Sequence, residues 1–232
     1  MAITKTGFMR GMQCPKMIWL DRHKPQFKII PPEVQERLDA GNEFGDRAMS
    51  MFGPYEEMTI YRPGTLIPDK KAMVANTLKH LEAGTPVICE AAFMNYNNYC
   101  AVDILRKTDT GYDIYEVKNT NELKEQFIED SAFQYFIIDR CQIKIDRIFI
   151  VLNSENEDDP YLIEEVTDKV KKLKNWVNEN IWRLNRLQYE KDEIEIEPGI
   201  QCNEPYECWY YGYCHPAMQD NTEERELIDE DI

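Results

Sequence analysis

The stretch PVICEAAFMNYNNYCAVDILRKTDTGYDIYEVKN, residues 86–119, decides the fold class. It contains three strand-like runs, PVICEAAFM, YCAVDILRK and GYDIYEVKN, separated by the polar turn segments NYNN and TDT. Because short polar turns join antiparallel neighbours, the three runs predict a β-meander.

Helices and one more strand are predicted around this meander. The continuous apolar run DRIFIVLN, residues 146–153, predicts a buried strand that pairs in parallel with the third strand through a right-handed crossover. Apolar residues at helical spacing predict helices over 4–20, 33–52, 69–82, 122–141 and 162–190. In the last helix, Trp176 and Trp182 are expected in the core. The order of helix, three strands, helix and strand predicts an α/β fold with a mixed sheet, helical additions and a cysteine-rich C-terminal loop.

The two hairpin turns place three carboxylates in a row across the sheet. A turn centred on Tyr96-Asn97 sets Glu90 opposite Asp103, and a turn centred on Asp109-Thr110 sets Asp103 opposite Glu116. Directly opposed residues have Cβ atoms about 4.5–5.5 Å apart. A register slip of one residue would break this row, and an exposed face would leave the acids merely hydrated.

Carboxylates crowded on a covered face need a cation, and oxygen ligands suit Mg²⁺ or Mn²⁺. We expect Asp103 and Glu116 to hold the metal, with Glu90 and the carbonyl of Val117 as further ligands. Lys118 lies two residues beyond Glu116 on the same face, where its ammonium would orient water or stabilise charge on a phosphate. Such a site is suited to phosphodiester hydrolysis. Gln134 and Tyr135, on the following helix, are within reach of the strand ends; a polar residue such as Gln134 also often faces water on a helix flank.

Four of the seven cysteines predict a second metal site. Cys202, Cys208 and Cys214 follow a C-x5-C-x5-C spacing, and Cys14 precedes a proline near the other end of the chain. Four thiolates bind either zinc or an iron–sulfur cluster, and the alternative is a set of unrelated thiols. Three further cysteines sit in apolar runs and are expected to be buried: Cys89, Cys100 and Cys141. The aromatic residues beside the C-terminal cysteines are expected to pack around the site.

The pattern Asp103…Glu116-x-Lys118 resembles the PD-(D/E)XK nuclease signature, and the element order matches that fold's restriction-endonuclease-like core. The cysteines that flank it resemble those of the iron–sulfur RecB-like exonucleases, which include the CRISPR-adaptation exonucleases and the nuclease domain of AddB. The resemblance runs from Cys14 to Cys214. It implies a [4Fe–4S] cluster on Cys14, Cys202, Cys208 and Cys214, with Mg²⁺- or Mn²⁺-dependent cleavage of DNA, often single-stranded and from an end. Gln134 then corresponds to the glutamine of the family's Q-x-x-x-Y motif.

The chain departs from that family at three points, which indicates a divergent branch. Gly45 stands where the first motif, G-x-x-x-H, has a histidine, and Glu43 is the candidate replacement ligand. Ile138 stands where Q-x-x-x-Y has its tyrosine, and the late cysteines are spaced more widely than in the commoner pattern.

Charge and length complete the prediction. The formal charge is −16, yet the first thirty residues hold six Lys and Arg against one Asp, so we expect DNA near Arg10, Lys16 and Arg22. We predict one nuclease-like domain over 1–218, closed by the cluster, and an acidic tail over 219–232. Without a signal peptide or an apolar run long enough for a membrane, the expected location is cytoplasmic.

The predicted activity is that of a metal-dependent DNA exonuclease, in CRISPR adaptation, DNA repair and recombination, or mobile-element defence. A helicase or a CRISPR-adaptation protein is the expected protein partner. The alternative is a catalytically weak or inactive DNA-binding or scaffold module that keeps the cluster, and the missing histidine motivates it.

Overall fold

A computed structural model describes residues 3–154, 156 and 158–215. The chain divides into two compact units, the first formed by Met1–Met9 and Leu38–Ile181 and the second by Arg10–Arg37 and Trp182–Ile232. The acidic tail predicted over 219–232 lies outside the described residues, and the single domain predicted over 1–218 stays a prediction. None of the helices in the described part combines the length and the hydropathy needed to cross a bilayer.

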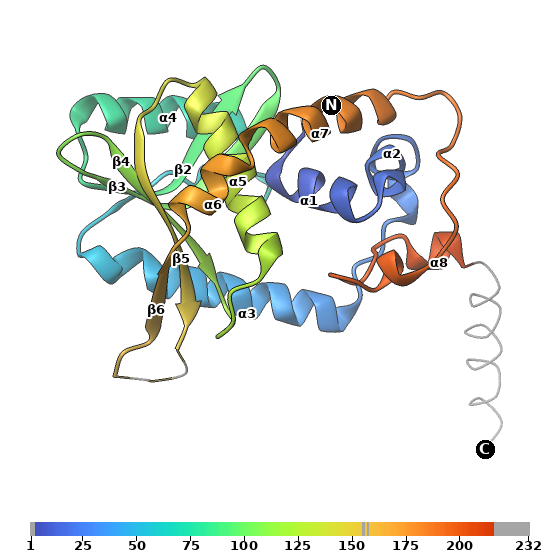
Figure 1. Cartoon of the computed structure of the whole chain (residues 1–232), viewed down its shortest axis with the longest axis horizontal. Helices are drawn as coiled ribbons and strands as arrows, with labels where there is room; N and C mark the ends of the chain where they lie inside the picture. Colours follow the sequence, from blue (N-terminus) through green and yellow to red (C-terminus); the bar gives the residue numbers. More distant parts are fainter. Residues whose placement is uncertain (1–2, 155, 157, 216–232) are drawn as a thin grey trace. The chain divides into compact units, whose positions relative to one another are not determined.

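The first unit contains a mixed six-stranded sheet in the order β1 to β6 (Figure 1). Strands β2, β3 and β4 form the predicted antiparallel meander, and β5 pairs in parallel with β4 through a helical crossover. The α/β class is therefore confirmed, with the element order of a restriction-endonuclease-like core. The strands are β1 (Glu56–Glu57), β2 (Val87–Asn95), β3 (Asn98–Lys107), β4 (Tyr112–Lys118), β5 (Ile145–Asn153) and β6 (Tyr161–Glu165).

Both predicted hairpin registers are confirmed. Ala92 pairs with Ala101 across the first hairpin, and Leu105 pairs with Ile114 across the second. Tyr96 adopts a left-handed conformation, with φ of +47°, at the centre of the first turn. The position of each turn fixes which residues face each other, so these pairs place the carboxylates in register.

Except for α8, the α-helices of the described part lie in the predicted helical segments, with shifted ends. The α4 helix begins after Asp69, whose carboxylate accepts the amide hydrogen of Ala72 at 3.1 Å, and ends at Gly84 in the left-handed region. The helices are α1 (Lys5–Gln13), α2 (Pro15–His23), α3 (Pro32–Met49), α4 (Lys70–Ala83), α5 (Glu125–Arg140), α6 (Thr167–Lys172), α7 (Lys174–Leu187) and α8 (Tyr211–Cys214).

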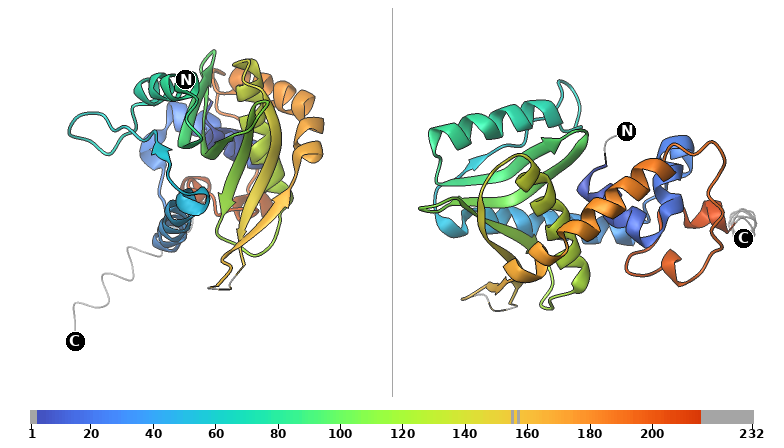
Figure 2. Two further views of the ribbon diagram at one scale, coloured as in Figure 1. Left: turned by 90° about the vertical axis from the view of Figure 1, so that its left-hand side faces the viewer. Right: turned by 45° about the horizontal axis from the view of Figure 1, so that its top comes forward.

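Helices cover both faces of the sheet. Figure 2 shows the helices on the two sides of the sheet. On one face, Met73 of α4 packs against Ala92 and Tyr99, and α5 lies over β2, β3 and β5. On the other face, Ala48 and Met49 at the end of α3 pack against residues of β2 to β5. Glu90, Asp103 and Glu116 belong to the face covered by α4 and α5, because they alternate with the residues that contact α3. The carboxylate row is therefore inside the structure.

Four predictions about elements and the core were wrong. The helix predicted over 162–190 is two helices, α6 and α7, separated at Leu173. Residues 161–165 form β6 and not the start of a helix, because β5 would otherwise leave an edge of unpaired backbone groups. The first predicted helix is two helices, α1 and α2, separated at Cys14 before Pro15. Trp182 is 72% exposed and does not belong to the core, whereas Trp176 packs edge-on against Phe8.

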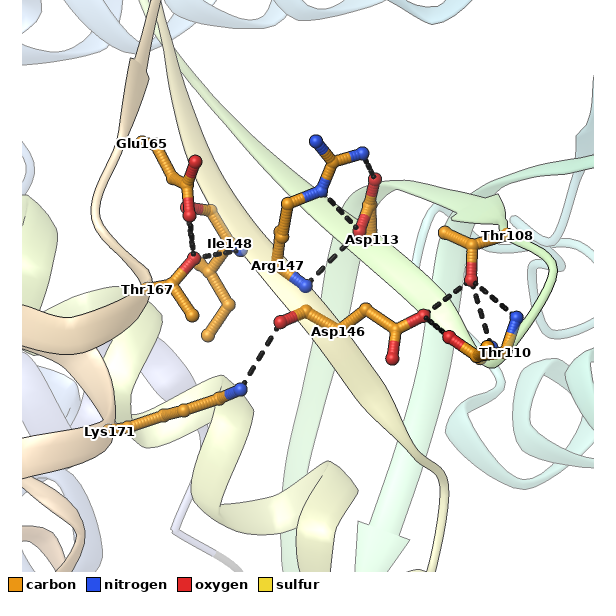
Figure 3. A network of polar contacts seen from close by, with 10 residues as sticks. Thr108, Thr110, Asp113, Asp146, Arg147, Ile148, Glu165, Thr167 and Lys171 are labelled. Atoms are coloured by element: carbon orange, nitrogen blue, oxygen red, sulfur yellow. Dashed lines mark hydrogen bonds and ion pairs between the residues drawn. The ribbon is translucent and has the colours of Figure 1, made fainter.

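A polar network fixes the far end of the hairpin formed by β3 and β4 (Figure 3). The buried carboxylate of Asp113 accepts hydrogen bonds from the backbone and the guanidinium of Arg147, the shortest at 2.7 Å. The carboxylate of Asp146 accepts from the hydroxyls of Thr108 and Thr110. These contacts join β5 to the start of β4. Glu116 lies near the other end of β4.

Glycine at position 111 is required by the close approach of this turn to β5. A Cβ atom on residue 111 would lie 2.5 Å from the carbonyl oxygen of Lys144, a backbone atom that cannot move aside. We predict that Gly111→Ala lowers the free energy of unfolding by about 1–3 kcal/mol in urea denaturation. Gly45→Ala is the matched control: a Cβ on that α3 residue meets no atom within 4 Å, so the variant should gain up to about 1 kcal/mol. Equal shifts in the two variants would contradict this account.

Candidate active site

The backbone pairing of β3 with β2 and with β4 is interrupted at the carboxylate row. Pairing between β3 and β4 ends at Ile104 and Tyr115, one residue before Asp103 and Glu116. On the other side, Glu90 has a φ of +52°, which is unusual for a residue with a side chain, and its pair with Asp103 is missing from the β2–β3 ladder. Interrupted ladders of this kind are common beside active sites because they redirect side chains.

Asp103 fills the gap left by the ended ladder. Its carboxylate accepts the amide hydrogen of Val117 at 2.6 Å, in place of a backbone acceptor from β3. This bond joins β3 to β4 and fixes the Asp103 carboxylate beside Glu116.

Glu116 is the best-satisfied member of the row. Its side chain is 1% exposed, and its two oxygens accept from three donors on three elements. The ammonium groups of Lys118 and Lys5 donate to Oε1 at 2.7 Å and 2.9 Å, and the amide of Gln134 donates to Oε2 at 2.6 Å. The structure thus brings the predicted Glu116, Lys118 and Gln134 together.

Two residues of this cluster were not predicted from the sequence. Asp130 of α5 accepts from Lys118 at 2.6 Å, and Lys5 reaches Glu116 from the first turn of α1. Asp130 lies one helical turn before Gln134, so the spacing itself was a usable signal. For Lys5 the sequence offered only its place in a basic N-terminal segment.

The structure separates two other predicted residues from the row. Glu43 is exposed on α3 and is not among the charged groups that act most strongly on the row. Tyr135 is half-buried on α5, with the ammonium of Lys171 5.8 Å from its ring centre. Neither therefore joins the group around Glu116.

The cluster carries excess negative charge when its groups are ionised. Four carboxylates (Glu90, Asp103, Glu116 and Asp130) face two ammonium groups (Lys5 and Lys118), which leaves two negative charges. Burial, and then the charge of Asp103, raise the pKa of Glu90 to about 8. Burial, and then the charge of Glu116, raise the pKa of Asp103 to about 6. The row therefore attracts protons or a cation.

Glu116 behaves in the opposite way. Burial acts to raise its pKa, but the charges of Lys118 and Lys5 outweigh burial and hold that pKa well below its ordinary value. An ionised Glu116 at the centre of the cluster is a ready ligand for a cation.

Several buried oxygen atoms on α5 lack partners. Oδ1 of Asp130 and Oε1 of Gln134 accept no hydrogen bond from any described residue. In the described part of the chain, no three Cys, His, Asp or Glu side chains are arranged so that they could hold a metal ion. At the row, the oxygens of Glu116 are engaged by lysines and an amide. The donor atoms nevertheless fit a hard divalent cation, because they are oxygens, are partly unsatisfied and carry surplus negative charge.

The second unit brings the four predicted cysteines to one small cavity. Cys14 precedes α2, Cys202 ends a 3-10 turn (Ile200–Cys202), and Cys214 ends α8. Together with Cys208 they line a cavity of about 10 Å³, whose other lining residues include Met17, Leu20 and Tyr210. All four thiols are free.

Hydrogen bonds between distant segments form the frame of this cavity. The amide of Gln13 donates to the carbonyl of Gln201 at 2.8 Å, and the indole of Trp19 donates to the carbonyl of Glu190 at 3.0 Å. The hydroxyl of Tyr210 donates to Asp21 at 2.7 Å. Residues 13–21 and 190–210 are therefore joined beside the thiols.

Burial raises the pKa of three of the four thiols. Burial, and then the neighbouring cysteines, raise the pKa of Cys208 to about 11. Burial also raises the pKa of Cys14 and of Cys214. Metal binding at this cavity must release the protons of these thiols, so affinity for metal should increase with pH.

The remaining cysteines and the aromatic residues follow most of the predictions. Cys89 and Cys100 are buried in the sheet, and Cys141 is half-buried. Tyr210 is buried beside the cysteines, and Tyr211 and Tyr213 pack against the same cluster.

All three residues near which DNA is predicted have partners within the second unit. Arg10 is 9% exposed, and its guanidinium lies 2.7 Å from the centre of the Trp209 ring. The ammonium of Lys16 pairs with Glu193 at 2.8 Å. The guanidinium of Arg22 stacks on the ring of Tyr189 at 4.1 Å.

No family model and no curated protein matches the chain. The crystal structure of an alkaline exonuclease (LHK-Exo) from Laribacter hongkongensis is 15% identical, with a TM-score of 0.33; the match covers 50% of this chain and 66% of that one, just under two thirds. The crystal structure of SSO0001 is 10% identical over 79% of this chain and 76% of that one, with a TM-score of 0.39. Similarity this low carries no information about what the chain does.

The ion pair between Lys5 and Glu116 is testable by a double-mutant cycle. Lys5→Met and Glu116→Gln each remove one partner of a largely buried pair, so each should lower the free energy of unfolding by about 1–3 kcal/mol. Because the groups contact each other, the double variant should lose less than the sum, with a coupling of at least about 0.5 kcal/mol. Lys71→Met, at an exposed position of α4, is the control and should be additive with Glu116→Gln. Additivity in the Lys5 cycle would contradict the contact.

Proposed function

We propose that this chain is a metal-dependent DNA nuclease that hydrolyses phosphodiesters at Asp103, Glu116 and Lys118. The observation that carries the proposal is the row itself: three adjacent strands bring Glu90, Asp103 and Glu116 together where the ladders open, with Lys118 2.7 Å from Glu116. A buried acidic row beside a fixed ammonium group suits metal-assisted attack on a phosphate.

Asp103 and Glu116 would hold the Mg²⁺ or Mn²⁺, with Glu90 and the carbonyl of Val117 as further ligands. When bound, the metal would polarise the phosphate and lower the pKa of a water molecule. The excess of carboxylates over ammonium groups and the unpartnered oxygens of α5 support a divalent cation here. Glu90 is better supported than Glu43 as the third acid, because Glu90 lies in the row and Glu43 is exposed.

Asp130 and Gln134 would hold Lys118 and Glu116 in position. Asp130 holds the ammonium of Lys118 at 2.6 Å, so that Lys118 is fixed where it would orient the attacking water or stabilise charge on the phosphate. Gln134 holds Oε2 of Glu116 and thereby sets the orientation of that carboxylate.

Single-stranded or end-bearing DNA is the substrate we propose. On the second unit, an open concave surface is lined by Trp182, Arg183, Asn185 and Arg186. The Trp182 ring is 72% exposed, and the Arg186 side chain is 76% exposed. Exposed aromatic rings beside arginines stack on unpaired bases and neutralise phosphates, whereas duplex bases offer no free faces.

We also propose that Cys14, Cys202, Cys208 and Cys214 hold a [4Fe–4S] cluster. Four free thiols around one cavity form the donor set that such a cluster requires. Four thiolates also bind a single zinc ion, and metal analysis distinguishes the two. The cluster would hold residues near the two ends of the second unit together.

Cleavage assays on end-labelled single-stranded and duplex DNA test the proposed activity. With Mn²⁺ we expect nucleotides to be released from the ends, and EDTA should abolish the reaction. Asp103→Asn and Glu116→Gln should lower the rate at least about 100-fold, because each removes a metal ligand. The control is Asp113→Asn, which changes another buried carboxylate of β4 and should retain cleavage. Undiminished cleavage by Glu116→Gln would refute the proposal, and DNA binding without cleavage under every condition would favour an inactive DNA-binding module.

Metal analysis of anaerobically purified protein tests the cluster. We expect about four iron atoms per chain and visible absorption, both lost in Cys208→Ser. Cys141→Ser, at a half-buried cysteine outside the cavity, should keep the iron. One zinc ion per chain without iron would contradict the cluster.

A further inference from the structure

Lys5 enters the active-site cluster from an element that carries no other member of it. Its ammonium lies 2.9 Å from Oε1 of Glu116 and 4.0 Å from Oδ2 of Asp130. Its side chain is 26% exposed, so it borders both the cluster and solvent.

The backbone around Lys5 is firmly anchored. The carbonyl of Ile3 accepts the amide hydrogen of Tyr99 of β3 at 3.0 Å. One turn later, the buried ring of Phe8 stacks on Phe133 of α5 at 4.8 Å. Lys5 is therefore directed at the row from a fixed start of α1, and only its flexible four-carbon side chain is free to move.

The charge of Lys5 acts on every carboxylate of the cluster. It lowers the pKa of Glu90, Asp103, Glu116 and Asp130, although these residues lie on four different elements. The Lys5 ammonium also contacts Glu116, one of the two proposed metal ligands, at 2.9 Å.

We propose that the Lys5 ammonium occupies the cation position of the site in the metal-free protein and leaves Glu116 when a divalent metal binds. This inference rests on the proposed metal site at Asp103 and Glu116. A metal on Oε1 of Glu116 would repel an ammonium on the same oxygen, so one of the two lysines must give way.

The distances identify Lys5 as the group that leaves. Lys118 is held by two carboxylates, at 2.7 Å from Glu116 and 2.6 Å from Asp130. Lys5 has one close partner, since its second carboxylate is 4.0 Å away, and its side chain already borders solvent. Lys118 therefore stays to act on the substrate, and Lys5 exchanges with the metal.

Titration of the full-length chain with Mn²⁺, followed by the electron paramagnetic resonance of free Mn²⁺, tests the exchange without any reaction. Lys5→Met removes the competing charge and should tighten Mn²⁺ binding about tenfold. Lys5→Arg keeps a permanent charge on a larger group and should weaken Mn²⁺ binding. This variant replaces Lys5→Met as the test if the methionine variant does not fold. Lys71→Met, which removes the same charge from an exposed position of α4, should change the affinity less than twofold.

The outcomes separate this inference from the proposed nuclease activity. Unchanged or weaker Mn²⁺ binding by Lys5→Met overturns the exchange, even where the protein cleaves DNA. Tighter binding that disappears when Asp103→Asn is added supports the exchange, even where no variant cleaves DNA. Equal Mn²⁺ binding by the native chain and by Asp103→Asn overturns the metal site and the exchange together.

Discussion

The burial of the Glu116 carboxylate is the constraint on which the rest of the first unit depends. An ionised group that is 1% exposed is stable only when its environment supplies donors and positive charge. Here three separate elements supply them: α1 through Lys5, β4 itself through Lys118, and α5 through Gln134. The hydrogen bonds to Glu116 thus hold α1 and α5 against the sheet, and they also bring the charged and polar groups of the site together.

This arrangement holds negative charge that the protein does not fully neutralise. Raised pKa values at Glu90 and Asp103, and unpartnered oxygens at Asp130 and Gln134, are the two signs of that imbalance. Clusters of buried ionisable groups with perturbed pKa values are frequent at functional sites. In the cysteine cavity of the second unit, burial likewise raises the pKa of Cys208, so a proposed metal would have to displace a proton there.

Local sequence pattern was enough to predict strands β2 to β5 and the acids on them. Turn position and the two-residue period of strands fix which residues oppose each other, so the row of Glu90, Asp103 and Glu116 followed from two hairpins. Gln134 stood out as a polar residue in an apolar helix. Lys5 could not be found in this way, because its contact with Glu116 spans 111 positions and depends on how α1 packs. The strand β6 was missed because its pairing satisfies the edge of β5, a tertiary requirement that residues 161–165 do not themselves reveal.

A crystal grown with Mn²⁺, with the metal located by its anomalous scattering, tests the central claim most directly. The account predicts a metal between the carboxylates of Asp103 and Glu116, Lys118 still on Asp130, and the Lys5 ammonium withdrawn from Glu116. A crystal at saturating Mn²⁺ with no metal at the row and with Lys5 still bound to Glu116 would contradict it.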